Sequence, residues 1–164
     1  MFFIILIVCR ANFRELIELL KRVHTQTGLI HRDVTIFNVF QFNDHIMLND
    51  WGCAATMGVE TVFSGNTTFA PQYILEKIIL QGNKAVRHTP TPKDDLEMVL
   101  KLFYLRINVY GCLIPPDHTS IDDIREIYSF WEEQFRPSVW TNLAEVARKS
   151  DYESLAKDIG NLIV

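Results

Sequence analysis

An apolar stripe at helical spacing stands near the start of the chain. The positions that form it lie three or four residues apart, at Phe13, Leu16, Ile17, Leu20 and Val23. This period predicts an amphipathic helix over 13–25. Asn12, followed three residues later by Glu15, has the form of a capping box and predicts that the helix begins there.

The apolar run from Phe2 to Cys9, ahead of this helix, has the length of a strand and is rich in Ile and Phe. We therefore expect a buried β-strand. The run falls far short of the ~20 residues that span a bilayer, which argues against a membrane anchor. A leader is the alternative, although no Lys or Arg precedes the run and no A-x-A site follows it. Residues 1–11 are thus expected to be a strand or a leader remnant, separate from a domain over 12–164.

Two short segments further along predict a β-hairpin. Val39–Phe42 and His45–Leu48 flank Asn43 and Asp44, a pair of residues that favours tight turns. The next stretch, 50–72, is rich in Gly, Thr, Ala and Ser without a clear period, and this indicates a loop.

Helical patterns dominate the rest of the chain, over 73–80, 94–104, 120–135, 138–149 and 150–159. The pattern over 94–104 is apolar enough to predict a deeply buried helix. No linker is long enough to separate two domains. We therefore expect one mainly α (α+β) domain with a small β-hairpin.

Composition and charge narrow the function. Among 164 residues, 16 Lys and Arg stand against 20 Asp and Glu, a formal net charge of −4, so no basic stripe is available for nucleic acid. Apolar residues make up 48%, which excludes intrinsic disorder. Cys9, Cys53 and Cys112 form no C-x-x-C pair, which argues against zinc and against a disulfide framework. A reducing compartment, cytoplasmic or nuclear, is the simpler expectation, with secretion as the alternative.

The polar residues around the hairpin are the candidates for chemistry. Asn38 comes just before its first strand and Asp50 soon after its second, so the hairpin should bring them together. Asp33, on the loop that enters the hairpin, can join them. Two carboxylates and an amide oxygen are ligands that Mg²⁺ prefers beside phosphate oxygens. A carboxylate not bound to the metal can accept a proton from an attacking hydroxyl.

These residues carry a resemblance to the protein kinase superfamily. The run from His31 to Asn38, HRDVTIFN, resembles the catalytic loop H-R-D-x-x-x-x-N, and Asp50-Trp51-Gly52 resembles the D-F-G triplet. Phe69–Gln72 is similar to the A-P-E end of the activation segment. Lys93–Glu97 resembles the start of the kinase F helix, and its D-D-L-E form is similar to casein-kinase-like enzymes. Several fungal and oomycete kinase-like families look similar in this lobe. The resemblance covers about 12–159 and only the C-terminal lobe.

The resemblance implies a role for each matched residue. Asp33 would orient the acceptor hydroxyl and accept its proton. Asn38 and Asp50 would bind Mg²⁺, and with Gly52 they would form the side of the site that holds ATP. The expected activity is transfer of a phosphoryl group from ATP to Ser or Thr hydroxyls of a protein substrate.

Supporting roles are implied as well. His31 and Trp51 would stack beneath the site, and Asp95 would hold the backbone of the catalytic loop. Arg32 would pair with a phosphorylated residue of the activation segment, for which the candidates are Thr61, Ser64, Thr67 and Thr68. The remaining histidines show no ligand spacing and are expected at the surface: His24, His45, His88 and His118.

The sequence also departs from the kinase pattern. None of the seven glycines forms G-x-G, and the sole Lys before His31 is Lys21. Thr35 and Phe37 stand where kinases place a Lys or an Arg. Gln72 replaces a Glu whose usual partner would match Arg136. We therefore expect impaired transfer. The alternatives are an inactive pseudokinase that binds a partner chain, and a fragment whose apolar lobe interface is exposed.

Overall fold

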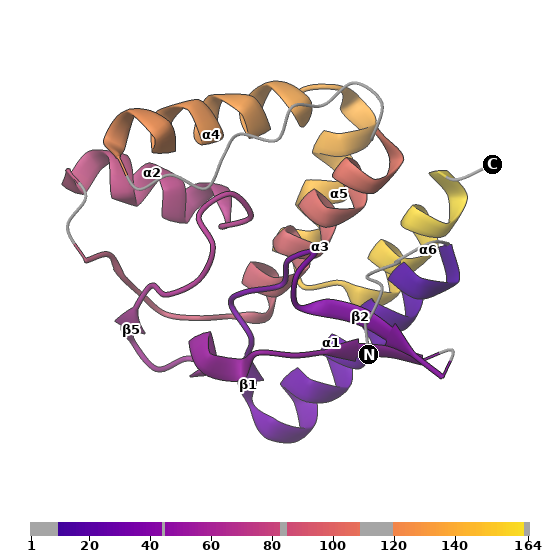
Figure 1. Cartoon of the computed structure of the whole chain (residues 1–164). Coiled ribbons are helices and arrows are strands. Elements are labelled where there is room, and N and C mark those ends of the chain that lie inside the picture. Colours follow the sequence, from indigo (N-terminus) through magenta and orange to yellow (C-terminus); the bar gives the residue numbers. More distant parts are fainter. Residues whose placement is uncertain (1–9, 44, 83–84, 109–119, 163–164) are drawn as a thin grey trace.

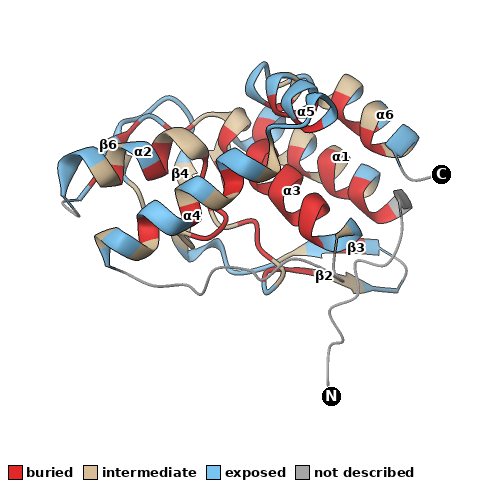
Figure 2. Cartoon of the chain, turned by 90° about the horizontal axis from the view of Figure 1, so that it is seen from above, coloured by how far each residue is buried: buried red, intermediate tan, exposed pale blue. Residues whose placement is uncertain are grey.

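Helix α3 (Pro92–Ile107) is the centre of the molecule, because every residue from Asp94 to Leu105 is buried. A helix that is apolar on most of its circumference is stable only when other elements surround it. Helices α1 and α5 pack against α3, and Figure 2 shows its largely buried ribbon in the middle of the helices. The deeply buried helix predicted over 94–104 is confirmed.

The computed structural model describes residues 10–43, 45–82, 85–108 and 120–162 (Figure 1). The other helices are α1 (Arg10–Thr27), α2 (Gln72–Gln81), α4 (Ile121–Gln134), α5 (Ser138–Arg148) and α6 (Tyr152–Leu162). The strands are β1 (Leu29–Ile30), β2 (Val39–Phe42), β3 (His45–Leu48), β4 (Ala55–Thr56), β5 (Thr61–Val62) and β6 (Arg87–His88). The predicted mainly helical α+β class is confirmed.

The predicted hairpin is confirmed residue for residue. Val39 pairs with Leu48 and Phe42 pairs with His45 in an antiparallel register, and Asn43 has the positive φ of 47° that a tight turn needs. Val39 and Ile46 are buried on the face toward α1, whereas Met47 points to the exposed face.

Two further sheets pin the long loop that the sequence predicts over 50–72. Strand β4 pairs with β1, and β5 pairs with β6, so the loop is attached at two places, 55–56 and 61–62. A short 3₁₀ turn over Trp51–Cys53 follows the hairpin. Helix α2 then packs against α4, and the two lie side by side along the top of Figure 1.

The start of α1 differs from the prediction. The helix begins at Arg10, so Asn12 is a buried residue inside the helix and does not form the N-terminal cap with Glu15. Helix α1 packs against α6, α3 and β3, and tertiary contacts of this kind commonly outweigh a local capping preference. The helix therefore also crosses the boundary expected between 1–11 and 12–164. The strand or leader expected over Phe2 to Cys9 lies outside the described residues.

Two histidines expected at the surface are buried. His24 is 2% exposed because it continues the apolar stripe of α1, four residues after Leu20. His88 is 4% exposed and contacts the Phe63 ring, with centroids 5.8 Å apart. Burial, with smaller effects from nearby cations, lowers the pKa of His88 to about 4. His45 is exposed, as predicted, and His118 lies outside the described residues.

The described helices include none that combines the length and the apolar character needed to cross a membrane.

The first turn of α3 generates a prediction about pH. Burial raises the pKa of Asp94 from 3.8 to about 6, although hydrogen bonds from Thr91 N–H (3.0 Å) and the Tyr73 hydroxyl (2.9 Å) oppose the shift. Because the folded-state pKa exceeds the unfolded one, Asp94 contributes stability that is fully present below pH 3.8 and is lost as pH rises through about 6.

In Asp94→Asn, which does not titrate, this loss should disappear. The free energy of unfolding of the variant relative to wild type should rise by about 2–3 kcal/mol between about pH 4 and about pH 7. Urea unfolding at both pH values measures the difference, with the exposed Asp122→Asn as the control. Parallel pH profiles for Asp94→Asn and wild type would contradict the expectation.

Candidate functional site

The loop between β1 and β2 is fixed from below by one buried carboxylate. Asp95 Oδ2 accepts a hydrogen bond from the His31 amide and Asp95 Oδ1 accepts one from the Arg32 amide, each at 2.7 Å. Asp95 belongs to the buried first turn of α3, so the loop takes its position from the central helix. Arg32 has a φ of 66°, an uncommon conformation for a residue with a side chain, and these bonds hold it there.

A second layer of side chains stands behind Asp95. His24 Nε2 lies 2.8 Å from Asp95 Oδ2, and His24 Nδ1 lies 2.7 Å from the Tyr152 hydroxyl. Burial, together with the charge of Asp95, raises the pKa of Tyr152 to about 12, so the phenol stays protonated. Helices α1, α3 and α6 thus meet at one hydrogen-bond chain that ends at the loop.

The structure brings together Asp33 and Asn38. Asn38 Nδ2 donates to Asp33 Oδ2 at 2.7 Å and to the Asp33 carbonyl at 2.9 Å. The other carboxylate oxygen, Oδ1, accepts a hydrogen bond from the backbone N–H of Asn66 at 2.8 Å. Gly65 makes this approach possible, because a Cβ there would lie 2.3 Å from the Arg32 carbonyl oxygen.

Asp50 lies at the same end of the hairpin, without a described hydrogen bond to this pair. The Asn49 amide donates to the Asn38 carbonyl at 2.8 Å, which brings the two strand ends together. The exposed Asp50 carboxylate instead accepts from the Gly52 amide at 3.2 Å. Asp33, Asn38 and Asp50 were all expected at one end of the hairpin. The described hydrogen bonds join the side chains of Asp33 and Asn38 and do not include that of Asp50.

The donor atoms fit a hard cation in their chemistry. Asn38 and Asp50 offer amide and carboxylate oxygens, which Mg²⁺ prefers. Within the part of the chain that the structure describes, no three His, Cys, Asp or Glu side chains gather as a ligand set. Any cation here would therefore take much of its coordination from phosphate oxygens and water.

His31 and Trp51 are in contact beneath the loop. Their ring centroids are 4.6 Å apart in an edge-to-face arrangement. His31 Nε2 lies 2.9 Å from the Asn49 carbonyl oxygen, and Trp51 Nε1 donates to the Leu48 carbonyl at 3.2 Å. The two rings therefore connect the loop to the end of β3.

Arg32 holds the segment that follows the hairpin. Its Nε donates to the Cys53 carbonyl at 2.6 Å and its Nη1 donates to the Val62 carbonyl at 2.8 Å. Ser64, two residues after Val62, is exposed, whereas the Thr68 hydroxyl is buried. Of the four phosphorylation candidates, Ser64 is thus the exposed residue and Thr68 the buried one.

The two positions where kinases carry a cation have other roles here. The Thr35 hydroxyl is buried and accepts from the Phe37 amide at 3.2 Å. Phe37 is 68% exposed. Neither side chain carries a positive charge.

The partner expected for Gln72 is different. Its Nε2 donates to the Tyr128 carbonyl at 2.9 Å rather than meeting Arg136, and its backbone amide donates to Glu97 Oε1 at 2.6 Å. The arginine that lies near Gln72 is Arg148, whose Nε is 3.8 Å from Oε2 of the same Glu97 carboxylate. Sequence reasoning missed Glu97 and Arg148 because their pairing joins two helices far apart along the chain.

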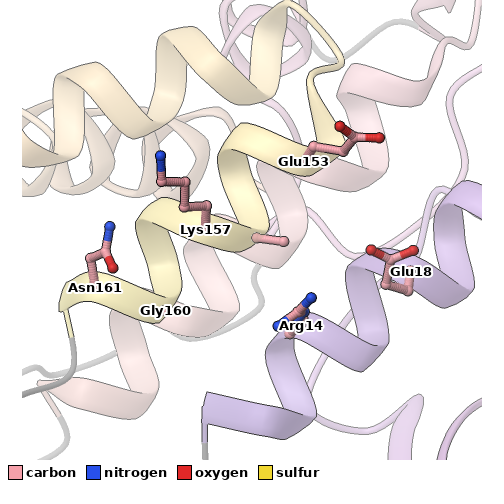
Figure 3. Close-up of a pocket in the computed structure, with 7 residues that line it drawn as sticks. Arg14, Glu18, Glu153, Lys157, Gly160 and Asn161 are labelled. Carbon is pink, nitrogen blue, oxygen red and sulfur yellow. The ribbon is translucent and has the colours of Figure 1, made fainter.

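A hollow of about 730 Å³ lies elsewhere, between α1 and α6 (Figure 3). Arg14 and Glu18 come from α1, and Glu153 and Lys157 come from α6. These charges balance, and Lys21 pairs with Glu153 at 3.1 Å. The Asp33 loop, by contrast, combines a fixed carboxylate, an amide and a shaped backbone, and it is the better candidate for chemistry.

No protein-family model matches the chain, and no curated protein matches it.

The Asp95 contacts generate a stability prediction. Asp95→Ala removes the acceptor of the His31 and Arg32 amides and leaves Nε2 of the buried His24 ring without its Asp95 partner. The free energy of unfolding should fall by about 3–5 kcal/mol. The control is Asp122→Ala in the exposed first turn of α4, which should change it by less than about 0.5 kcal/mol. Denaturant unfolding measures both, and similar small losses would contradict the role given to Asp95.

Proposed function

We propose that the chain is the C-terminal lobe of a protein-kinase-like domain, with a site built for phosphoryl transfer to a protein hydroxyl. The observation that carries this proposal is the pair of 2.7 Å hydrogen bonds from the His31 and Arg32 amides to Asp95. Those bonds orient the loop so that the Asp33 carboxylate meets Asn38 at 2.7 Å. Preorganised groups of this kind supply most of the catalysis in phosphoryl transfer.

Asp33 is the proton acceptor in this proposal. The oxygen of a Ser or Thr hydroxyl forms a bond to the γ-phosphorus of ATP while the bond from that phosphorus to the bridging oxygen breaks and ADP leaves. The hydroxyl proton passes to the Asp33 carboxylate. Asn38 restrains that carboxylate, and the Asn66 amide holds its second oxygen. Asn38 and Asp50 would hold Mg²⁺, which neutralises charge on the phosphates.

Transfer by these 164 residues alone should be slow. Thr35 and Phe37 leave the transferring group without a cation, and loss of one preorganised donor costs on the order of 3 kcal/mol, or about a hundredfold in rate. The sequence also carries no G-x-G to cover the phosphates. Weak nucleotide binding with little turnover is the expected behaviour.

Calorimetry with Mg-ATP tests the site without a known protein substrate. We expect magnesium-dependent binding of ATP with a Kd above about 0.1 mM. Asp50→Asn should abolish it, and Asp122→Asn, an exposed carboxylate on α4, should leave it unchanged. Absence of any magnesium-dependent heat, or equal binding by Asp50→Asn, would refute the proposed site.

A radiolabelled-ATP assay with a general protein acceptor tests turnover separately. Transfer should stay near background in wild type and in Asp33→Asn. Clear transfer by wild type that Asp33→Asn abolishes would show that the expectation of impaired catalysis is wrong.

A second candidate is an inactive lobe that binds a partner chain. Four large apolar side chains on or beside the hairpin are exposed, and this observation favours it: Phe37, Phe42, Met47 and Trp51. Exposed apolar groups gathered in one region mark protein interaction sites.

This candidate predicts that the chain binds a hydrophobic dye such as ANS in its folded state. Met47→Ser with Phe37→Ser should reduce the dye signal at least about twofold, because the double variant removes two of the four apolar side chains. Leu80→Ser, at an exposed position on α2, is the matched control. A wild-type chain that fails to bind the dye would contradict the candidate.

A further inference from the structure

Three side chains bind the backbone of the segment from Thr68 to Gln72 at alternate residues. Trp131 Nε1, from α4, donates to the Thr68 carbonyl at 2.6 Å. Lys101 Nζ, from α3, donates to the Ala70 carbonyl. Glu97, one turn earlier on α3, accepts from the Gln72 amide at 2.6 Å. We name Glu97, Lys101 and Trp131 the backbone clamp.

The buried cation of the clamp is costly. Lys101 is 0% exposed, and removing an ammonium from water costs several kcal/mol even after the protein relaxes. An apolar side chain of similar volume, such as Met, would fill the same space without that cost. The compensating contacts are the Ala70 carbonyl, the Trp131 ring at 5.1 Å and the neighbouring Glu97 carboxylate. Packing alone would not require a cation here, and the contact that only a donor such as Lys101 can make is the hydrogen bond to the Ala70 carbonyl.

The clamped segment closely follows Gly65 and Asn66, the residues that touch the loop between β1 and β2. Asn66 donates its amide to Asp33 Oδ1 at 2.8 Å, and Gly65 lies against the Arg32 carbonyl. The Phe69 and Ala70 amides bond back to the Asn66 side chain (3.4 Å) and the Thr67 carbonyl (3.2 Å). The position of Asn66 beside Asp33 is therefore set from the far side of the segment.

We propose that Glu97, Lys101 and Trp131 are positioning residues that fix residues 64–72 against Asp33 through the segment backbone. Glu97 thereby supplies the carboxylate that position 72 lacks, and Arg148 pairs with it from α5. The importance of this placement for an acceptor hydroxyl rests on the proposed function, whereas the clamp itself does not.

The charge state of Lys101 supports the geometry. Burial lowers its pKa to about 8, while Glu97 opposes the shift and Arg148 adds to it. The groups facing Lys101 are Glu97 on α3, Arg148 on α5 and the uncharged Trp131 ring on α4. Near neutral pH the ammonium is charged and binds the Ala70 carbonyl most strongly, and above about pH 8 it becomes a weaker, neutral donor.

Hydrogen exchange read by mass spectrometry tests the clamp in the 164-residue chain. Lys101→Met keeps the volume and removes the donor, and Trp131→Phe removes the donor to Thr68 while keeping an aromatic ring. Each should raise exchange of peptides within 64–72 at least about tenfold and leave peptides of α1 and α5 within about threefold of wild type. Lys93→Met is the matched control, since Lys93 lies over the Tyr73 ring at 5.0 Å.

A packing role for Lys101 and Trp131 would move all core peptides together, because α3 is central. Uniform acceleration, or unchanged exchange over 64–72, would overturn the proposal. If Lys101→Met does not fold, Trp131→Phe alone decides between these outcomes.

The pH dependence gives a second readout. Between about pH 7 and about pH 9, protection of 64–72 should fall in wild type and stay constant in Lys101→Met. Over the same range the lowered folded-state pKa makes Lys101 favour the folded state as pH rises, so global stability changes in the opposite direction. Parallel local and global changes would contradict the clamp. Failure of Mg-ATP binding would refute the proposed function and leave these exchange results standing.

Discussion

The Asp95 carboxylate is the interaction on which the site depends. Its two oxygens satisfy two consecutive backbone amides and the His24 ring, all in a place without water access. The left-handed backbone of Arg32 costs roughly 1 kcal/mol or more, and these hydrogen bonds offset it. Because Asp95 lies on the buried helix α3, these bonds tie the loop to the core of the molecule. Asp33 and Asn38, on the irregular segment that follows, take their positions from this anchored backbone.

Local patterns were enough to predict most elements. The hairpin has the predicted strands because its alternating residues and its Asn43 turn agree with each other. The helices follow their apolar periods, and the buried character of α3 is visible in its composition. The proximity of Asp33 and Asn38 also follows from sequence, since both belong to one short loop with a tight turn at its end.

Long-range partners could not be predicted in this way. Glu97 and Lys101, four residues apart, have the spacing of an exposed helical ion pair, yet both are buried against other elements. From the sequence, Arg136 and Arg148 are equally good candidates for the arginine near Gln72, and only the packing of α5 decides between them. The burial of His24, by contrast, could have been predicted, because its place four residues after Leu20 puts it on the apolar stripe of α1. The capping signal at Asn12 failed because tertiary packing outweighs a local preference.

The hydrogen bond between His31 and Asp95 joins residues 64 positions apart along the chain. A nascent polypeptide can therefore form α1 and the hairpin on the ribosome well before α3 emerges from the exit tunnel. Until that moment the His31–Arg32 peptide has no acceptor, and closing so large a loop makes its ordering a late event. Chaperones would meet a molecule with finished local elements and an unfinished centre.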